Sequence, residues 1–292
     1  MGREANTTFG SAWLLDMLIV CLKWVDVRCI YAFASIFVMP VCLLLNTNHS
    51  RTTAYRYFRH HQGWGRWRSA WGTYINHCRF AEVVVDRFAM FAGKRFNLKI
   101  EGYEEFLKRA EKPEGFMLFS SHIGCYEIAG YSLVAKTKRF NALVFGGEKA
   151  TVMEGRQRQF SQNNIRMIPV KPDMSHLFLV NEALANHEIV SMPADRKVGS
   201  SKTQTCAFLG QPAQFPLGPC SVATMRELDV LAVNVMKAGT KTYKVYVAPL
   251  SYDKTASRKV QMQQLADSYA KELECRVRQY PEQWFNFYDF WA

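Results

Sequence analysis

The chain lacks the C-x-x-C spacing that zinc sites and redox centres use. Its eight cysteines are spread over 292 residues, at positions 21, 29, 42, 78, 125, 206, 220 and 275. Neither a zinc site nor a disulfide framework is therefore predicted, and no metal is expected. We expect most of these cysteines to be small core residues of a protein in a reducing compartment.

Acidic residues are also scarce. The sequence has 25 Asp and Glu against 37 Lys and Arg, which gives a formal net charge of +12. This excess favours an acidic partner, such as anionic lipid, an acidic protein or nucleic acid. With 49% hydrophobic residues, a chain of this length can form one large domain or two small ones with a sizeable core.

We expect no secretory signal peptide at the amino terminus, because no small-residue cleavage site follows a basic start. Residues 11–45 are mostly apolar, but Asp16, Lys23, Asp26 and Arg28 interrupt the first part. The charge-free stretch at 29–45 contains Pro40 and is at the lower edge of what crosses ~30 Å of hydrocarbon. Three interpretations stay open: a tilted spanning helix, an apolar hairpin embedded from the cytoplasmic side, and a hydrophobic helix packed on a soluble core.

Arginines alternate with aromatic residues over positions 51–68. Such a stretch suits single-stranded nucleic acid, a membrane interface with anionic lipid or an ordinary solvated face. Its position directly after an apolar segment favours the membrane, and we expect no nucleic-acid partner. Residues 71–91 have the apolar spacing of a helix, with Asp86 and Arg87 off the apolar face. We therefore expect a hydrophobic helical anchor over 1–50 and a helical, basic and aromatic interface segment over 51–96.

From residue 97 onward, apolar runs that read as strands alternate with helical segments. The predicted strands are 97–101, 115–119, 140–146, 165–170 and 188–192, and the helices between them are 103–110, 128–135, 151–163 and 175–185. A helix at 221–226, an antiparallel pair at 229–235 and 243–249, and a helix at 261–278 complete the pattern. This alternation predicts a three-layer α/β domain over 97–292 with a mainly parallel sheet.

A histidine and a carboxylate, His122 and Glu127, follow the buried run 115–119. Ligands of open α/β sheets bind beyond the carboxyl ends of the strands. The two residues can meet only if the chain turns between them, which Gly124 makes easy. The pattern then predicts a general base with an orienting carboxylate, although a structural histidine and a helix-capping glutamate fit the spacing too. Cys125 is the nearest candidate nucleophile and is disfavoured.

Four blocks of the sequence, in order, resemble the late acyltransferases of bacterial lipid A biosynthesis. The first is His122-Ile123-Gly124-Cys125-Tyr126-Glu127, similar to the family's His-x-Gly-Asn-Trp-Glu. The others are the strand end at Asp195-Arg196, the stretch 207–213 and the terminal Pro281-Glu282-Gln283-Trp284. The chain departs from the family at Cys125 and Tyr126, and in the aromatic stretch 286–291, where an aromatic residue and two arginines usually follow.

The resemblance implies a glycerolipid-acyltransferase-like fold with an N-terminal membrane anchor at the cytoplasmic face of the inner membrane. It implies transfer of an acyl chain from acyl carrier protein or acyl-CoA, as co-substrate and without a further cofactor, to a lipid A precursor. His122 and Glu127 would be catalytic. Asp195 and Arg196 carry the second block, and backbone N–H groups near Gly124 or Gly218, or Arg196, would stabilise the oxyanion.

Two alternatives to this function stay open. In the first, the acceptor is another lipid, such as a lysophospholipid, an aminolipid or a glycolipid. In the second, the chain is a non-catalytic lipid-binding protein.

Overall fold

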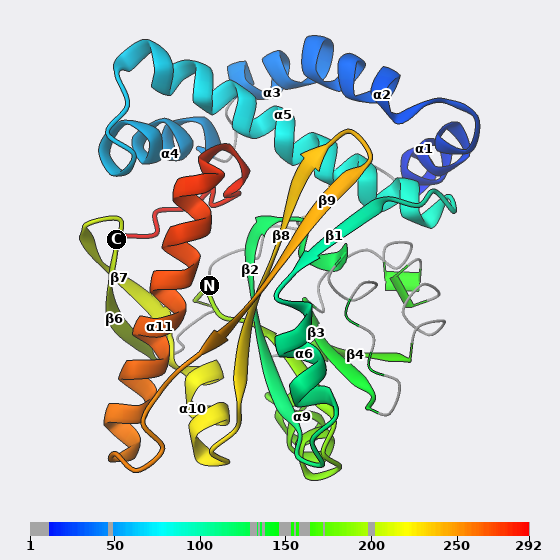
Figure 1. Ribbon diagram of the computed structural model, residues 1–292. Helices are drawn as coiled ribbons and strands as arrows, with labels where there is room; N and C mark the ends of the chain where they lie inside the picture. The colour runs from blue at the N-terminus through cyan, green and yellow to red at the C-terminus, as the bar shows by residue number, and fades with distance from the viewer. Residues whose placement is uncertain are drawn as a thin grey trace.

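The computed structural model describes residues 12–45, 49–128, 138–145, 164–171, 173–197 and 202–291, together with 133, 135, 153–154 and 156–157. Its centre is a seven-stranded sheet in the order β1-β9-β8-β2-β5-β3-β4 (Figure 1). Neighbouring strands are parallel except for the antiparallel pair β8–β9. The strands are β1 (Asn97–Glu101), β2 (Phe116–Gly124), β3 (Phe140–Phe145), β4 (Ile165–Val170), β5 (Ile189–Pro193), β8 (Val230–Gly239) and β9 (Thr242–Leu250).

Strand β2 shows why the sheet is covered on both faces. Its apolar residues alternate between two clusters, with Met117 and Phe119 in one and Phe116 and Leu118 in the other, as the period of two requires. The first cluster packs against α9 (His176–Ala185), α10 (Leu217–Met225) and α11 (Arg258–Gln279), and the second against α6 (Tyr103–Ala110). The predicted three-layer α/β fold with a mainly parallel sheet is confirmed.

Most element bounds agree with the prediction to within a few residues, but one hairpin was not predicted. Strands β6 (Thr203–Phe208) and β7 (Gln211–Pro216) pair with each other and form a separate two-stranded sheet. Their sequence is partly polar and contains two prolines, so it lacks the apolar runs used to find the other strands. The predicted helices at 128–135 and 151–163, and Gly199, which follows the second block in the sequence, lie largely or wholly outside the described residues.

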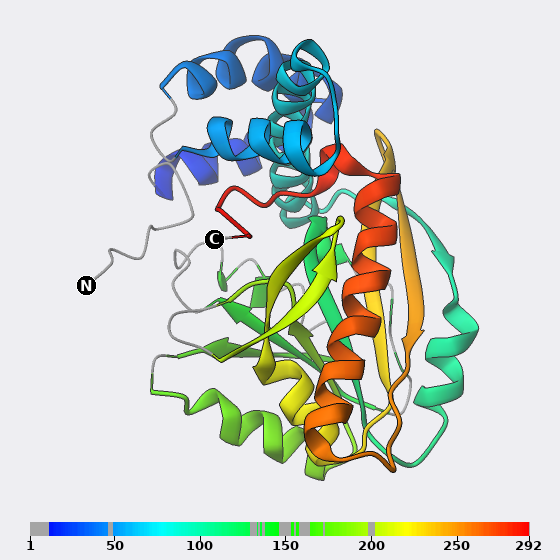
Figure 2. The same cartoon turned by 90° about the vertical axis from the view of Figure 1, so that its left-hand side faces the viewer.

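The N-terminal residues form a helical layer at the end of the sheet where β2 and β8 finish (Figures 1 and 2). Its elements are α1 (Ala12–Trp24), α2 (Val27–Phe33), η1 (Ala34–Val38), α3 (Met39–Leu45), α4 (Ser50–Arg56), η2 (Tyr57–His61) and α5 (Arg66–Phe91). Among the described residues, one helix, Val27–Leu45, is long and apolar enough to cross a membrane. Its middle part, Ala34–Val38, is a short π-helix, and Pro40 follows it closely. Proline has no N–H group and so cannot donate an α-helical hydrogen bond.

Helix α5 differs from the prediction in the environment of Asp86. The residue was expected off the apolar face, but its side chain is fully buried. Lys237 at the end of β8 and Tyr243 of β9 both donate to it. A buried carboxylate is tolerated here because charged and hydroxyl donors surround it. Arg87, the other residue expected off that face, forms an ion pair with Glu127.

The C-terminal segment closes the same edge of the sheet. After α11 comes a short helix, η3 (Pro281–Gln283). The side chain of Gln283 accepts from the backbone N–H of Lys237 and donates to its carbonyl, both at 2.8 Å. The next residue, Trp284, is 2% exposed and bridges to Ile123. The Gln–Trp pair of the fourth block therefore fixes the C-terminal segment beside β2.

Candidate active site

Strand pairing brings together two residues that are far apart in the sequence. Strands β2 and β5 are parallel neighbours, and Ser120 lies opposite Pro193. Two positions further along each chain are His122 and Asp195. The Nδ1 atom of His122 lies 2.8 Å from Oδ1 of Asp195, and the backbone N–H of His122 donates to Oδ2, also at 2.8 Å. The site is thus at the carboxyl edge of the sheet, where ligands of α/β folds bind.

The His122–Asp195 pair is asymmetric in its exposure. The side chain of Asp195 is 2% exposed, whereas that of His122 is 25% exposed. Burial opposes the charge of Asp195, but the charge and hydrogen bonds of His122, together with Arg196, outweigh it and lower the pKa of this carboxyl. The ionised carboxylate holds the proton on Nδ1, which leaves Nε2 as the basic nitrogen.

Glu127 is not the carboxylate that contacts His122 in this structure, which corrects the hypothesis drawn from the sequence. Its Oε1 atom lies 2.5 Å from Nη2 of Arg156 and 3.3 Å from Nη1 of Arg87. Glu127 is 5% exposed. Burial alone would raise its pKa, but the charges of Arg156 and Arg87 outweigh burial and lower it. The turn after β2 directs this carboxylate toward α5 instead.

Gly124 makes that turn. Its φ is +59°, and a Cβ built on it would lie 1.9 Å from the carbonyl oxygen of Val235 on the neighbouring strand. The next residue, Cys125, donates its N–H to the same carbonyl at 2.8 Å. The Cys125 side chain is buried, and burial raises the pKa of its thiol far above the usual range. This environment is inert and does not suit a nucleophile.

The other two predicted site residues lie in different surroundings. Arg196 follows Asp195 directly, and its Nη2 donates to the carbonyl of Phe285 at 2.5 Å while the guanidinium lies over the ring of Tyr288. Gly218 is the second residue of α10, which packs against α11 and β6. Within the described ranges, no hydrogen bond joins Gly218 to His122.

Several neighbours of the site were not found from the sequence. Arg156 is 1% exposed although it comes from a stretch that reads as a polar helix. The hydroxyl of Tyr269 donates to the carbonyl of Ser120 at 2.8 Å, and that of Tyr288 lies 3.5 Å from the carbonyl of Asp195. No local pattern marks these residues, because strand and helix packing alone bring them to the edge.

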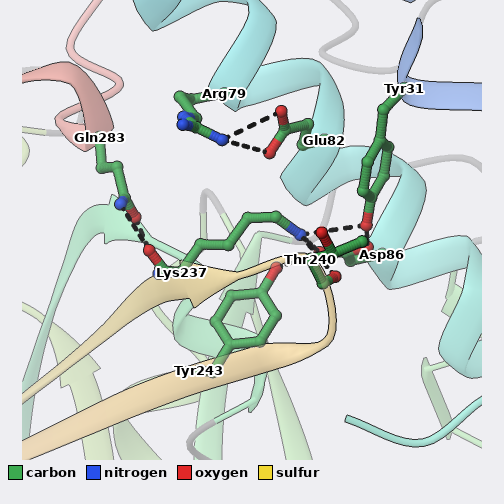
Figure 3. Close-up of polar contacts among 8 residues, drawn as sticks. All are labelled: Tyr31, Arg79, Glu82, Asp86, Lys237, Thr240, Tyr243 and Gln283. Carbon is green, nitrogen blue, oxygen red and sulfur yellow. Dashed lines mark hydrogen bonds and ion pairs between the residues drawn. The ribbon is translucent and has the colours of Figure 1, made fainter. Parts of the chain in front are cut away.

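A cavity of about 510 Å³ lies away from these residues, between α5, the β8–β9 turn and the end of α11. Its lining is polar, and part of it is drawn in Figure 3. None of the six predicted site residues lines this cavity. In the part of the chain that the structure describes, no three His, Cys, Asp or Glu side chains lie close enough to share a metal ion.

Comparison with known proteins identifies the family. No curated protein matches the sequence. Among solved structures, the 1-acyl-sn-glycerophosphate (LPA) acyltransferase PlsC from Thermotoga maritima matches with 14% identity and a TM-score of 0.39, over 90% of this chain and 98% of that one. Residues 85–292 match the family of bacterial lipid A biosynthesis acyltransferases. The chain is therefore an acyltransferase that belongs to the bacterial lipid A biosynthesis acyltransferase family.

Proposed function

We propose that this acyltransferase moves a fatty acyl chain from an acyl thioester to a hydroxyl group of a lipid A precursor. Its family implies an acyl donor and a lipid acceptor. The observation that carries the proposal is the partly exposed His122, held at Nδ1 by the buried Asp195 at the carboxyl edge of the sheet.

The proposed reaction begins when Nε2 of His122 removes the proton from the acceptor hydroxyl. Asp195 orients the ring and stabilises the imidazolium that forms. The acceptor oxygen then attacks the thioester carbonyl. When the tetrahedral intermediate collapses, the C–S bond breaks and the imidazolium returns its proton to the thiolate. Acceptor and donor thus become an ester and a free thiol, and no protein nucleophile is needed.

The oxyanion of that intermediate needs a hydrogen-bond donor, whose removal typically costs about 2.7–4 kcal/mol. We propose Arg196 for this role. It is adjacent to Asp195, and the carbonyl of Phe285 occupies Nη2 only, out of the five N–H donors of its guanidinium. The backbone N–H of Gly124 is a second proposed donor, and Gly218 has the weakest support.

Glu127 is proposed as a positioning residue. Its ion pairs with Arg87 and Arg156 connect the turn after His122 to helix α5. Because all three side chains are at least largely buried, this cluster holds the end of β2 in one geometry. Loss of the carboxylate would remove its ion pairs with Arg87 and Arg156, which would loosen the turn that follows His122.

We infer that the donor is acyl carrier protein and that the enzyme works at the cytoplasmic face of the inner membrane. The net charge of +12 supports both inferences, since an acidic carrier and an anionic membrane surface each attract a basic protein. Acyl-CoA is the alternative donor. A donor comparison at low and high ionic strength tests this choice, because docking of an acidic protein weakens with salt.

Another membrane lipid is the second candidate acceptor. The observation that favours it is the aromatic C-terminal stretch, which places Tyr288 beside Asp195 and Arg196. The family's basic pair is expected in this stretch, and its absence suits an acceptor with fewer phosphates. A lysophospholipid, an aminolipid or a glycolipid would each fit.

The decisive experiment is lipid mass spectrometry of a bacterial strain without this protein. The strain is compared with the same strain expressing the wild-type chain, His122→Ala or Cys125→Ser. We expect lipid A to lose one acyl chain in the deletion strain. The wild type and Cys125→Ser should restore it, and His122→Ala should not.

Each other outcome contradicts a defined part of the proposal. If a different lipid class lost an ester-linked chain, the proposed acyl transfer would stand but its acceptor would be that lipid instead of a lipid A precursor. If His122→Ala restored the acyl chain of lipid A, His122 would not be the base. If Cys125→Ser folded but did not restore the chain, the thiol of Cys125 would be the nucleophile.

A further inference from the structure

The cavity between α5 and the end of α11 holds charged side chains that the proposed reaction does not use. Its volume of about 510 Å³ lies within the ~300–1,000 Å³ of typical small-molecule sites. Arg68, Arg79 and Glu82 line it from α5, Lys237 lines it from β8, and Glu282 lines it from η3. Three elements that are far apart in the chain therefore bring charged groups to one polar cavity.

Buried hydrogen bonds hold the walls of this cavity in place. The ammonium group of Lys237 donates to the buried Asp86 of α5 (Figure 3). The side chain of Gln283 binds the backbone N–H and carbonyl of Lys237, each at 2.8 Å. In addition, Nδ2 of Asn76 on α5 donates to the carbonyl of Glu282 at 3.0 Å. The cavity is therefore preformed, as small-molecule sites usually are.

Two side chains at the cavity have unused hydrogen-bonding groups. Among the described residues, the guanidinium of Arg68 has no hydrogen bond or ion pair and lies over the ring of Trp64, 4.1 Å from its centroid. Its five N–H donors are therefore available. Within the same ranges, the carboxylate of Glu282 has no hydrogen bond or ion pair either. The cavity thus offers both a cationic donor and an anionic acceptor.

Arg79 adds further donors to the cavity because it is only partly engaged. Its Nη1 atom donates to both carboxylate oxygens of Glu82, at 3.1 and 3.0 Å (Figure 3). The Nε and Nη2 atoms have no partner in the part of the chain that the structure describes, and the side chain is 44% exposed. Two guanidinium groups therefore present unused N–H donors, a combination that suits the oxygens of a phosphate group.

We propose that this cavity binds a phosphorylated sugar or polyol. The phosphate group accepts from Arg68 and Arg79, and a hydroxyl group of the ligand donates to Glu282. An inorganic phosphate ion would satisfy the arginines but not the carboxylate, and it would fill only a small part of the volume. A neutral sugar would leave both arginines without an anion. The lining therefore requires a ligand with both an anionic group and hydroxyl donors.

The cavity is connected to the catalytic pair through the C-terminal segment. Gln283 lines the cavity, and two residues later the backbone N–H of Phe285 donates to the carbonyl of His122 at 3.2 Å. The carbonyl of Phe285 accepts from Arg196. A ligand that bridges α5 and η3 would therefore stabilise the segment that contacts His122. Because binding is measured without turnover, this inference does not depend on the proposed acyl transfer.

Calorimetry of the full-length protein with three probes tests the ligand class. The probes are inositol monophosphate, inositol and inorganic phosphate, all at one ionic strength. We expect inositol monophosphate to bind at least about tenfold more tightly than the other two, because it alone engages both the arginines and the carboxylate. Equal affinities for inositol monophosphate and inorganic phosphate would overturn the polyol part of the proposal. Tighter binding of glucuronate, which has a carboxylate instead of a phosphate, would overturn the phosphate part.

Variants of the charged groups locate the ligand. Arg68→Gln should weaken binding of inositol monophosphate by about tenfold or more, because a hydrogen bond between charged groups is lost. Arg66→Gln is the matched control, since Arg66 is exposed on the same helix and is not among the residues that line the cavity. Glu282→Ala should lower the preference for inositol monophosphate over inorganic phosphate. Equal losses for the two arginine variants would mean that binding responds only to net charge, which would overturn the site.

Hydrogen exchange of the C-terminal segment tests the connection to His122. We expect saturating inositol monophosphate to slow exchange of the amides over 281–288 in the wild type. At the same concentration it should have little effect on Arg68→Gln. Unchanged exchange in the wild type with the probe bound would overturn the connection between the cavity and His122.

A competition experiment identifies the source of the ligand, which is either a free sugar phosphate or the head group of a lipid. Detergent micelles with phosphatidylinositol present the same phosphorylated polyol on a lipid, and micelles of detergent alone are the control. Displacement of inositol monophosphate by the lipid micelles would identify a lipid head group as the ligand. If neither kind of micelle displaced it, the ligand would be a free sugar phosphate.

Discussion

Asp195 uses both of its carboxylate oxygens on one residue. One accepts from the backbone N–H of His122 and the other binds its ring nitrogen, each at 2.8 Å. This double contact fixes the histidine's main chain and its tautomer together, which a single hydrogen bond would not. The backbone hydrogen bond holds the carboxylate of Asp195 beside the strand end, where its other oxygen meets the ring.

Asp195→Asn tests this role directly. An asparagine has one carbonyl oxygen and one NH2 group at these positions, and the NH2 group cannot accept the second hydrogen bond. We expect turnover of an acyl-thioester donor to fall on the order of 10³–10⁴-fold with KM little changed, because the ground state binds as before. Asp253→Asn is the control, since Asp253 lies in an exposed turn where it accepts from Thr255. A loss of less than tenfold for Asp195→Asn would return the orienting role to Glu127.

At the scale of elements, the turn after β2 depends on Gly124. Its positive φ disfavours any side chain, and a Cβ would also meet the carbonyl of Val235 at 1.9 Å. Gly210 provides a matched comparison, with a φ of +79° and no atom within 4 Å of a Cβ. The difference between the two sites therefore isolates the close approach of β2 to β8.

We expect Gly210→Ala to cost about 1 kcal/mol of unfolding free energy, the cost of a strained backbone. Gly124→Ala should cost at least ~2–3 kcal/mol more, because β2 and β8 must separate. Chemical denaturation of both variants, followed by circular dichroism, measures the difference. If both variants lost the same unfolding free energy, β2 and β8 would separate without cost. Gly124 would then be required only for the backbone conformation of the turn.

The sequence predicts elements better than it predicts the site. Apolar patterning identified β1, β3 and β4 almost to the residue. Strand β1 alternates polar and apolar residues, as a partly exposed edge strand does, whereas β3 and β4 are mostly apolar. The partner of His122 was missed because Asp195 lies 73 positions away. Its contact follows from the pairing of β2 with β5, and one sequence alone does not give strand order. Nearness in the chain favoured Glu127 instead.

The same reasoning explains the misplaced Asp86. Helical periodicity put this residue on the polar face of α5, and that face is indeed polar at Arg79 and Glu82. Periodicity cannot show that Lys237 comes from a distant strand to meet the carboxylate inside the protein. Buried ion pairs between elements are therefore poorly predicted from any single element.

At the scale of the whole molecule, three charged residues connect the N-terminal layer to the edge of the sheet that carries His122. Arg87 belongs to α5, Glu127 to the turn after β2, and Arg156 to a further segment. The folded protein lowers the pKa of Glu127, since the charges of both arginines outweigh burial. A lowered pKa stabilises the fold above the unfolded value, and this contribution is lost as the pH falls through the folded value.

We therefore expect Glu127→Gln to lower stability by about 3–5 kcal/mol at neutral pH, because the largely buried ion pairs of Glu127 with Arg87 and Arg156 are lost. The ordinary pKa of a glutamate is about 4.3. Below that pH, the difference in unfolding free energy between wild type and variant should narrow as the wild-type carboxylate becomes protonated. Glu105→Gln, which removes a partly exposed partner of Lys108 and Arg109, should change stability far less. Thermal unfolding of the three proteins across the acid range measures this, and a gap that stays constant down to pH 3 would show that the arginines are not held by the charge of Glu127.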